Sequence, residues 1–255
     1  MPASAPQNLP DDPAQLALFL DVDGTLLPLA ATPADVRVEP STTALLTRLN
    51  KLLGGTLALV SGRTIANLDE LFAPQRFIAA GQHGAEWRDG AGHTQQLRAH
   101  LEELEELRAR LQRLAAQDPR LLVEDKGLSL ALHYRRVPER AEELAGSLQA
   151  AVAGYPALSL QRGKYVLEIR PASCGKDTAI RYLLGTPEFA GRTPIFAGDD
   201  ATDENAFRLV NTLGGLSIKV GAGASNARYR LADPTALRVW LAELAQPSVQ
   251  ITVLS

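Results

Sequence analysis

A short apolar run that ends in acidic residues is the feature that most constrains the fold of this 255-residue chain. Residues 16–20 read Leu-Ala-Leu-Phe-Leu, and Asp21-Val22-Asp23-Gly24-Thr25 follows at once. A nearly continuous apolar run of this length is typical of a strand that is buried on both faces of a parallel sheet. Asp-Gly-Thr is a turn signal. We therefore predict a buried strand over residues 16–22, with acidic side chains at its carboxyl end.

Helical and strand patterns alternate early and late in the chain. The predicted helices cover residues 40–53, 64–71, 176–184 and 203–210, and the predicted strands cover residues 56–60, 77–80, 194–197 and 216–220. Such alternation indicates parallel strands joined by right-handed helical crossovers. We predict an α/β fold with a Rossmann-like, doubly wound parallel-sheet core.

The middle of the chain follows a different pattern, in which a helix and a strand-turn-strand are repeated. The first helix carries a leucine stripe, the second covers residues 139–152, and the two turns are Lys126-Gly127 and Arg162-Gly163. The stripe lasts under three heptads, which favours a core-facing helix over a dimerising coiled coil. Its members are Leu97, Leu101, Leu104, Leu107, Leu111 and Leu114. We predict an inserted α+β domain at residues 101–170, with residues 1–100 and 171–255 forming the core domain.

The charge and the cysteine content of the chain limit which macromolecules it can bind and in which compartment we expect it. With 26 basic and 29 acidic side chains, the net charge of -3 leaves no broad cationic surface for nucleic acid or anionic lipid. The only cysteine, Cys174, cannot form an intrachain disulfide, which fits a reducing compartment. No basic segment precedes the first apolar run, and that run is too short to span a bilayer. We expect a monomeric, cytoplasmic protein that binds neither nucleic acid nor membrane.

Polar residues follow several of the predicted strands, where the ligands of open α/β sheets bind. They are Asp21 and Asp23, Ser61-Gly62-Arg63, Gly198 to Glu204, and Lys176 after the insert. Each has a common structural explanation as a turn, a helix cap or a solvated residue. Together, however, the aspartates would repel one another unless a cation such as Mg²⁺ compensated them, and a lysine and a serine suit a phosphoryl group. An aspartate beside a metal can accept that group as an acyl phosphate.

The same residues resemble the motifs of a known superfamily. Asp21 to Thr25, Ser61, Lys176 and Gly198-Asp199-Asp200 are similar to the four motifs of the haloacid dehalogenase-like (HAD) phosphohydrolases. Within that superfamily, other segments resemble the trehalose-6-phosphate phosphatase family over residues 16–233. They are residues 81–86 (GQHGAE), 123–127 (VEDKG), 133–135 (HYR), 167–171 (LEIRP) and 198–204 (GDDATDE).

The resemblance implies a role for each residue of the phosphate site. Asp21 would attack phosphorus, and Asp23 would protonate the leaving sugar oxygen and then take a proton from water. Ser61 and Lys176 would hold phosphate oxygens. Asp177 departs from the family, which more often has glycine there, and it places an additional carboxylate near Lys176.

The resemblance also implies a Mg²⁺ site. The ion would lie on the Asp21 carboxylate, the Asp23 backbone carbonyl and Asp199. Asp200 and Asp203 would orient Lys176 and the water molecules that coordinate the ion.

The insert would then act as a cap that closes over the sugar of trehalose 6-phosphate. Polar groups on a closing cap pair with sugar hydroxyls and exclude bulk water. The resemblance assigns substrate binding to Glu124, Lys126, Glu168, Arg63 and His83.

Two alternatives remain open from the sequence. Another capped phosphatase, for sucrose phosphate or a mannosyl phosphoester, would share the core residues and differ in the cap. A phospho-receiver module also stores phosphate on an aspartate in a doubly wound fold. Asp23 argues against a receiver, because a receiver needs its acyl phosphate to persist and gains nothing from an adjacent general acid.

Overall fold

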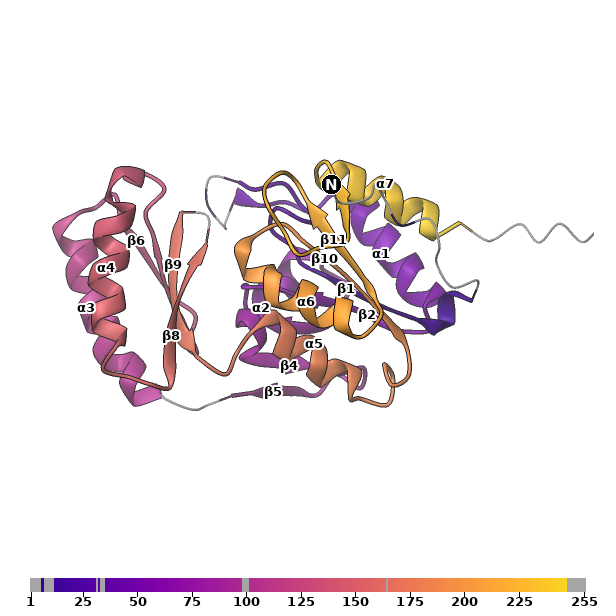
Figure 1. Ribbon diagram of the computed structural model, residues 1–255, viewed down its shortest axis with the longest axis horizontal. Helices are drawn as coiled ribbons and strands as arrows, with labels where there is room; N and C mark the ends of the chain where they lie inside the picture. The colour runs from indigo at the N-terminus through magenta and orange to yellow at the C-terminus, as the bar shows by residue number, and fades with distance from the viewer. Residues whose placement is uncertain are drawn as a thin grey trace, which may run out of the picture.

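The computed structural model describes residues 6, 12–30, 32, 35–97, 101–163 and 165–246. Figure 1 shows a larger part around an eight-stranded sheet and a smaller part, at the left of the view, built on a four-stranded sheet. Among the described residues, no helix combines the length and the apolar character that crossing a membrane would require.

The large sheet is parallel over six strands and has an antiparallel hairpin at one edge. Its strands are, in spatial order, β12 (Tyr229–Leu231), β11 (Leu216–Val220), β10 (Thr193–Gly198), β1 (Leu16–Leu20), β2 (Leu57–Val60), β3 (Ile78–Gly81), β4 (Glu86–Arg88) and β5 (Thr94–Gln96). The chain proceeds from β1 to β3 in one direction and from β10 to β12 in the other. The strand order therefore reverses between β1 and β10, where ligands of such sheets bind.

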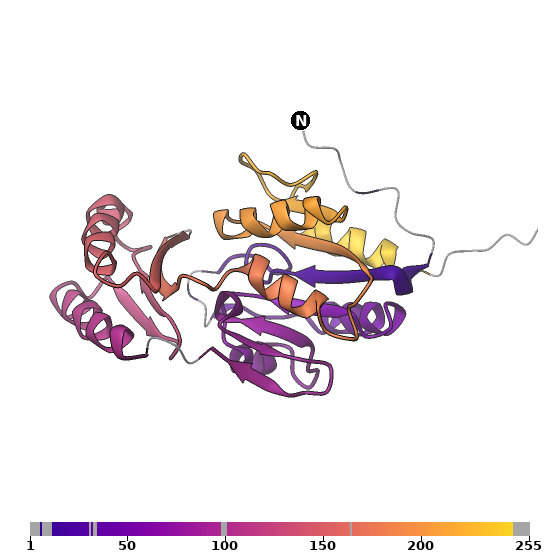
Figure 2. The same ribbon diagram turned by 60° about the horizontal axis from the view of Figure 1, so that its bottom comes forward.

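Helices cover both faces of this sheet (Figure 2). They are α1 (Pro40–Leu52), α2 (Ile65–Leu71), α5 (Lys176–Leu184), α6 (Glu204–Thr212) and α7 (Pro234–Leu244). Alternate residues of β1 serve the two layers, because successive side chains of a strand point to opposite faces. Leu16, Leu18 and Leu20 pack in the core under α1, α2 and α7. Ala17 and Phe19 pack in the core under α5 and α6. The predicted strand is thus buried on both faces.

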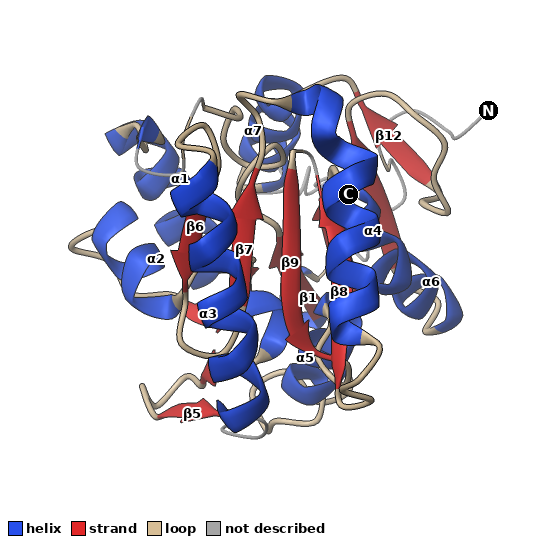
Figure 3. Cartoon of the chain, turned by 90° about the vertical axis from the view of Figure 1, so that its left-hand side faces the viewer, coloured by secondary structure: helices blue, strands red, loops and turns tan. Residues whose placement is uncertain are grey.

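The smaller part is an antiparallel sheet covered by two helices on one face (Figure 3). Its strands are, in spatial order, β6 (Leu122–Asp125), β7 (Leu130–His133), β9 (Val166–Pro171) and β8 (Leu158–Gly163). The helices are α3 (Leu101–Gln117) and α4 (Ala141–Val152). Leu130, Leu132 and Ile169 pack with leucines of both helices. The alternate residues, among them Glu168, lie on the opposite face, which is turned toward the larger part.

Several elements differ from the sequence prediction. Leu97 lies outside α3, and its N–H donates to the Ala85 carbonyl at 2.7 Å. Assigning Leu97 to the helical stripe was therefore wrong, because this residue continues the line of β5. The three-residue strands β4, β5 and β12 were not predicted, since so few residues carry no period of their own. Helix α7 was also missed, although Asp233 caps it by accepting a hydrogen bond from Ala236 N at 2.8 Å.

Because only one face of the small sheet packs on helices, we predict that shortening a side chain on that face lowers the free energy of unfolding more than shortening one on the other face. Leu132→Ala should lower the free energy of unfolding by about 2–5 kcal/mol, because Leu132 is fully buried and its loss leaves a cavity. Leu122→Ala, on the same sheet but 52% exposed, should change it by less than about 0.5 kcal/mol. Urea denaturation of both variants measures the difference, and equal effects would contradict the assigned faces.

Candidate active site

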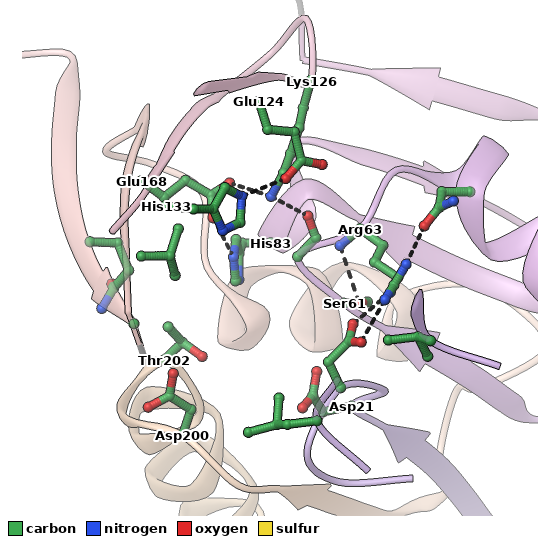
Figure 4. A pocket seen from close by; sticks show the side chains of 18 of the residues that line it. Asp21, Ser61, Arg63, His83, Glu124, Lys126, His133, Glu168, Asp200 and Thr202 are labelled. Carbon is green, nitrogen blue, oxygen red and sulfur yellow. Dashed lines mark hydrogen bonds and ion pairs between the residues drawn. The ribbon is translucent and has the colours of Figure 1, made fainter. Parts of the chain in front are cut away.

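The ends of β1, β2 and β10 meet the small sheet at a cleft (Figure 4). The residues predicted for the site come together there: all of them line the cleft except Asp203, which lies beneath it, fully buried. Asp21 follows β1, Ser61 follows β2, Asp199 follows β10, and Lys176 is the first residue of α5. The parallel strands thus place four separate segments at one edge of the sheet.

Asp21 is buried and bound on both oxygens. Lys176 Nζ lies 2.7 Å from its Oδ1, and the Thr25 hydroxyl donates to its Oδ2 at 2.8 Å. The same hydroxyl lies 3.2 Å from Asp199 Oδ1 and so ties the two aspartates together. Burial raises the pKa of Asp21 well above its ordinary value despite the Lys176 charge, and the charges of Asp203 and Asp199 add to the rise.

Asp203 orients the other groups of the phosphate site. Its Oδ1 accepts a hydrogen bond from Lys176 Nζ at 2.6 Å, and its Oδ2 accepts from the N–H groups of Asp199 and Asp200 at 2.9 Å each. Burial opposes the charged form of Lys176, but the charges of Asp203 and Asp21 outweigh it and raise the Lys176 pKa. Lys176 is therefore a permanent cation between two carboxylates.

Asp200 and Asp177 do not contact Lys176. Asp200 caps the short helix η5 (Ala201–Asp203), where its Oδ1 accepts a hydrogen bond from Ala201 N at 2.7 Å. The Asp177 carboxylate folds back against the backbone of Gly175. In this structure neither Asp200 nor Asp177 therefore acts on Lys176 through a direct hydrogen bond or ion pair.

The acidic residues fit a divalent cation. Carboxylate oxygens of Asp21, Asp199 and Asp203 lie within 4.8 Å of one another. Asp21 and Asp199 line the cleft, whereas Asp203 lies beneath it, which leaves Asp21 and Asp199 as the two carboxylates that could face an ion. Gly24 makes room for this pair: its φ is +84°, and a Cβ there would collide with the Asp199 carboxylate. One or two carboxylates completed by water and phosphate are what Mg²⁺ uses in proteins.

Arg63 binds the second aspartate of the motif. Its Nε and Nη2 lie 2.6 Å and 2.7 Å from the two oxygens of Asp23, and its Nη1 donates to Asn67 Oδ1 at 2.5 Å. The helix that follows is capped twice, because Thr64 Oγ1 accepts from Asn67 N and Glu86 Oε1 accepts from Ile65 N. These bonds hold the loop of Ser61 and Arg63 against the end of β1.

His83 lies in a tight turn that faces the small sheet. Its φ of +54° is in the left-handed region, and its Nε2 lies 2.9 Å from Glu168 Oε2 (Figure 4). Burial lowers the pKa of His83, so its ring is neutral at pH 7 and its Nε2–H donates to the glutamate. A Cβ on Gly62 would lie 2.6 Å from that ring nitrogen, so this position has to be glycine for the ring to fit.

Glu168 is the centre of the contact between the two parts. Its Oε1 accepts hydrogen bonds from Ser129 Oγ at 2.7 Å and Lys126 Nζ at 3.3 Å, and Lys126 also donates to the Gly62 carbonyl at 2.8 Å. Burial favours the neutral acid, but the charge of Lys126 and the bonds from His83 and Ser129 hold the Glu168 pKa well below its ordinary value. A glutamate of the insert is thus an anion held by both parts.

His133 and Gln161 are among the lining residues that were not assigned from the sequence. His133 Nε2 lies 2.8 Å from Glu124 Oε2, and this hydrogen bond lowers the Glu124 pKa. Gln161 lines the cleft from β8. Strand alternation is the signal that could have found both, because it places them on the same sheet face as Glu168. Arg135 donates to the Ala30 carbonyl at 2.6 Å and so forms a further bond to the larger part.

Comparisons with known proteins agree with this geometry. The family model described as trehalose-phosphatase matches residues 19–235. A probable trehalose-phosphate phosphatase of Sinorhizobium fredii is 48% identical over 233 residues, covering 90% of this chain and 87% of that protein. The trehalose-6-phosphate phosphatase of Escherichia coli is 40% identical over 232 residues, covering 91% and 87%.

Solved structures show the same fold. The C-terminal domain of the Candida albicans trehalose-6-phosphate phosphatase matches with a TM-score of 0.83 at 22% identity, covering 91% of this chain and 93% of that domain. A HAD phosphatase of Bacteroides thetaiotaomicron matches with a TM-score of 0.61 at 14% identity, covering 94% and 98%.

The doubly wound sheet and these structural matches define a HAD fold, as predicted. The matches of the chain to sequence families are more specific. The chain belongs to the trehalose-phosphatase family and is a phosphoric monoester hydrolase. This membership excludes the phospho-receiver alternative.

The crowded carboxylates predict an unusual pH dependence for the metal-free protein. Burial and the Asp203 charge raise the pKa of Asp199 from 3.8 to about 6, so ionised Asp199 destabilises the folded state above pH 6. Asp199→Asn should therefore stabilise the metal-free protein at pH 8 by on the order of 1–3 kcal/mol. The gain should shrink as the pH falls through 6 and vanish below about 4, where the acid is protonated in both states.

Calorimetry in EDTA between pH 4 and 8 measures this difference. Glu243→Gln, the same kind of change at an exposed site on α7, is the control and should show no such trend. If Asp199→Asn is no more stable than the parent at pH 8, the Asp199 carboxylate does not destabilise the folded protein and the prediction is wrong.

Proposed function

We propose that the protein is a Mg²⁺-dependent phosphatase that hydrolyses trehalose 6-phosphate to trehalose and inorganic phosphate, the last step of trehalose biosynthesis. The observation that carries this proposal is the buried Asp21–Lys176 pair beneath a polar sheet face of the insert. The trehalose-phosphate phosphatase activity for which the relatives are named supports the choice of substrate. Another sugar phosphate of similar size is the alternative that the experiment below tests.

Asp21 is the nucleophile in this proposal. One of its oxygens forms a bond to phosphorus while the bond from phosphorus to the sugar oxygen breaks, which leaves an aspartyl phosphate. Lys176 and the Ser61 hydroxyl bind the nonbridging phosphate oxygens, where negative charge has to be stabilised. Lys176 suits this role because it is held in place by Asp203 and stays charged.

Asp23 is the general acid and base. It gives a proton to the departing sugar oxygen, and it then takes a proton from the water that attacks the aspartyl phosphate and releases phosphate. Arg63 has only donors, so both Asp23 oxygens that it contacts act as acceptors. These contacts favour the ionised form of Asp23, so opening of at least one of them when the substrate enters would favour proton donation.

Mg²⁺ would be held by the Asp21 and Asp199 carboxylates and the Asp23 backbone carbonyl. When bound, it neutralises the carboxylates and withdraws charge from the phosphoryl group. Asp203 and Asp200 hold the loop that carries Asp199.

We further propose that residues 101–170 form a cap that binds the sugar. Glu124, Lys126 and Glu168 line the cleft from the insert, where they can pair with sugar hydroxyls. Two of the three also contact the core: Glu168 binds His83, and Lys126 binds the Gly62 carbonyl. The same side chains can thus close the cap and recognise the sugar, with His83 and Arg63 on the core side of the cleft.

Phosphate release from a panel of sugar phosphates tests the proposed activity. Trehalose 6-phosphate should be the best substrate with Mg²⁺, and EDTA should abolish turnover while circular dichroism shows an intact fold. Asp21→Asn should also abolish turnover, because an amide is a poor nucleophile and forms no acyl phosphate. Faster phosphate release from sucrose phosphate or a mannosyl phosphoester would show that trehalose 6-phosphate is not the preferred substrate. Full activity in EDTA would show that the reaction does not need Mg²⁺.

The insert should control specificity. Glu124 hydrogen-bonds to His133 of the insert and, among the described residues, to no residue of the core, so Glu124→Ala is the sharpest of the three cap substitutions. It should lower kcat/KM for trehalose 6-phosphate about tenfold and leave p-nitrophenyl phosphate hydrolysis nearly unchanged, since the small substrate leaves no buried sugar-binding group unpaired. Lys126→Ala and Glu168→Ala should lower kcat/KM for the sugar phosphate at least as much.

The exposed Glu139→Ala in the same insert is the matched control and should change neither activity. Equal loss of both activities in all three cap variants would mean that these residues act on folding or closure. No loss of either activity would mean that they are solvated charges.

A further inference from the structure

One row of side chains crosses the face of the small sheet that lies over the cleft. Glu124 is opposite Ala131, Ala131 is opposite Glu168, and Glu168 is opposite Gln161. Residues that are directly opposite in neighbouring antiparallel strands project to the same face, with their Cβ atoms about 5 Å apart. Gln161 therefore continues the row that holds both glutamates of the proposed sugar site, and it too lines the cleft.

A half-buried arginine determines which way the Gln161 amide is turned. Arg170 Nη2 donates to Gln161 Oε1 at 3.1 Å. Because a guanidinium has no acceptor, the amide atom beside it has to be the carbonyl oxygen. The amide NH₂ is then directed away from Arg170. It lies 3.3 Å from the Arg162 carbonyl, which takes one of its two N–H groups and leaves the other available.

Gln161 is an unusually important partner for Arg170. The guanidinium Nε and Nη1 are buried and, among the described residues, have no hydrogen-bond partner. A buried cation with unpaired donors is unfavourable, so the remaining bond to Gln161 is costly to lose. The carbonyl oxygen of Gln161 is accordingly held toward Arg170.

The other polar groups of the row supply mostly acceptors. Ionised Glu124 and Glu168 can only accept hydrogen bonds, and Lys126 Nζ already uses two of its three N–H donors on Gly62 and Glu168. A disaccharide, however, carries ring and glycosidic oxygens that can only accept. An N–H donor at the end of the row would recognise such an oxygen.

We propose that Gln161 is a substrate-binding residue that sets sugar specificity by donating its amide N–H to an acceptor oxygen of the sugar. Arg170 is the positioning residue that keeps the amide in this orientation. The inference rests on the proposed function and adds to it a donor that complements the two glutamates.

Gln161→Glu tests the donor, because the carboxylate keeps an acceptor for Arg170 and removes the N–H. It should lower kcat/KM for trehalose 6-phosphate about tenfold, mainly through KM, with p-nitrophenyl phosphate hydrolysis and Tm little changed. Gln161→Met, which adds no charge, should cause a similar loss. Gln149→Glu at an exposed position of α4 is the matched control and should change neither substrate.

The result that would overturn the proposal is a wild-type kcat/KM in Gln161→Met. If only Gln161→Glu loses activity, the added charge and not the lost donor is responsible, and the proposal also fails. Wild-type protein that does not hydrolyse trehalose 6-phosphate in the same assay would instead refute the proposed function. The two failures are therefore distinguishable.

A double-mutant cycle tests Arg170. Arg170→Met should raise KM for trehalose 6-phosphate about fivefold when Gln161 is present and should add little when Gln161 is already methionine, because it acts through the amide. Additive losses would show that Arg170 only stabilises the fold. Tm values of all four proteins identify any variant that fails to fold.

Discussion

One buried lysine governs the electrostatics of the site. Lys176 lies between Asp21 and Asp203, and together with Asp199 these carboxylates crowd their oxygens within 4.8 Å of one another. In a buried site such crowding favours protonation unless positive charge is supplied. Lys176 supplies part of it and leaves an excess of negative charge that a divalent cation can balance. Since Lys176 is also the first residue of α5, the helix that follows the insert depends on the same ion pairs.

One face of the small sheet packs the core of the insert, and the other, in the proposed function, binds the sugar. Leu130, Leu132 and Ile169 pack against α3 and α4, so the sheet does not need its other face for a core. That face can therefore carry Glu124 and Glu168 over the cleft. An antiparallel sheet with one apolar and one polar face suits an insert of this kind, because side-chain alternation separates the two tasks within each strand.

Hydrogen bonds made by two charged side chains of the insert join the two parts across the cleft. Glu168 comes from the insert and accepts a hydrogen bond from His83 of the core, while Lys126 of the insert donates to the backbone of the loop that follows Ser61. A phosphate group held at the end of the large sheet would thus lie beside the loop that the insert already contacts. In the proposed mechanism this arrangement links sugar binding in the insert to phosphate chemistry in the core.

The sequence by itself determined the α/β class, most of the long elements and the residues that end the parallel strands, because these signals are local. Helix α5 and strand β11 begin and end at the predicted residues. Only the tertiary structure decided which distant side chains meet. Arg63 pairs with Asp23 across 40 residues, and Gln161 lies opposite Glu168 because of strand register. Alternation tells which face of a strand a residue occupies, but the partner opposite it depends on how the apolar face packs against the helices.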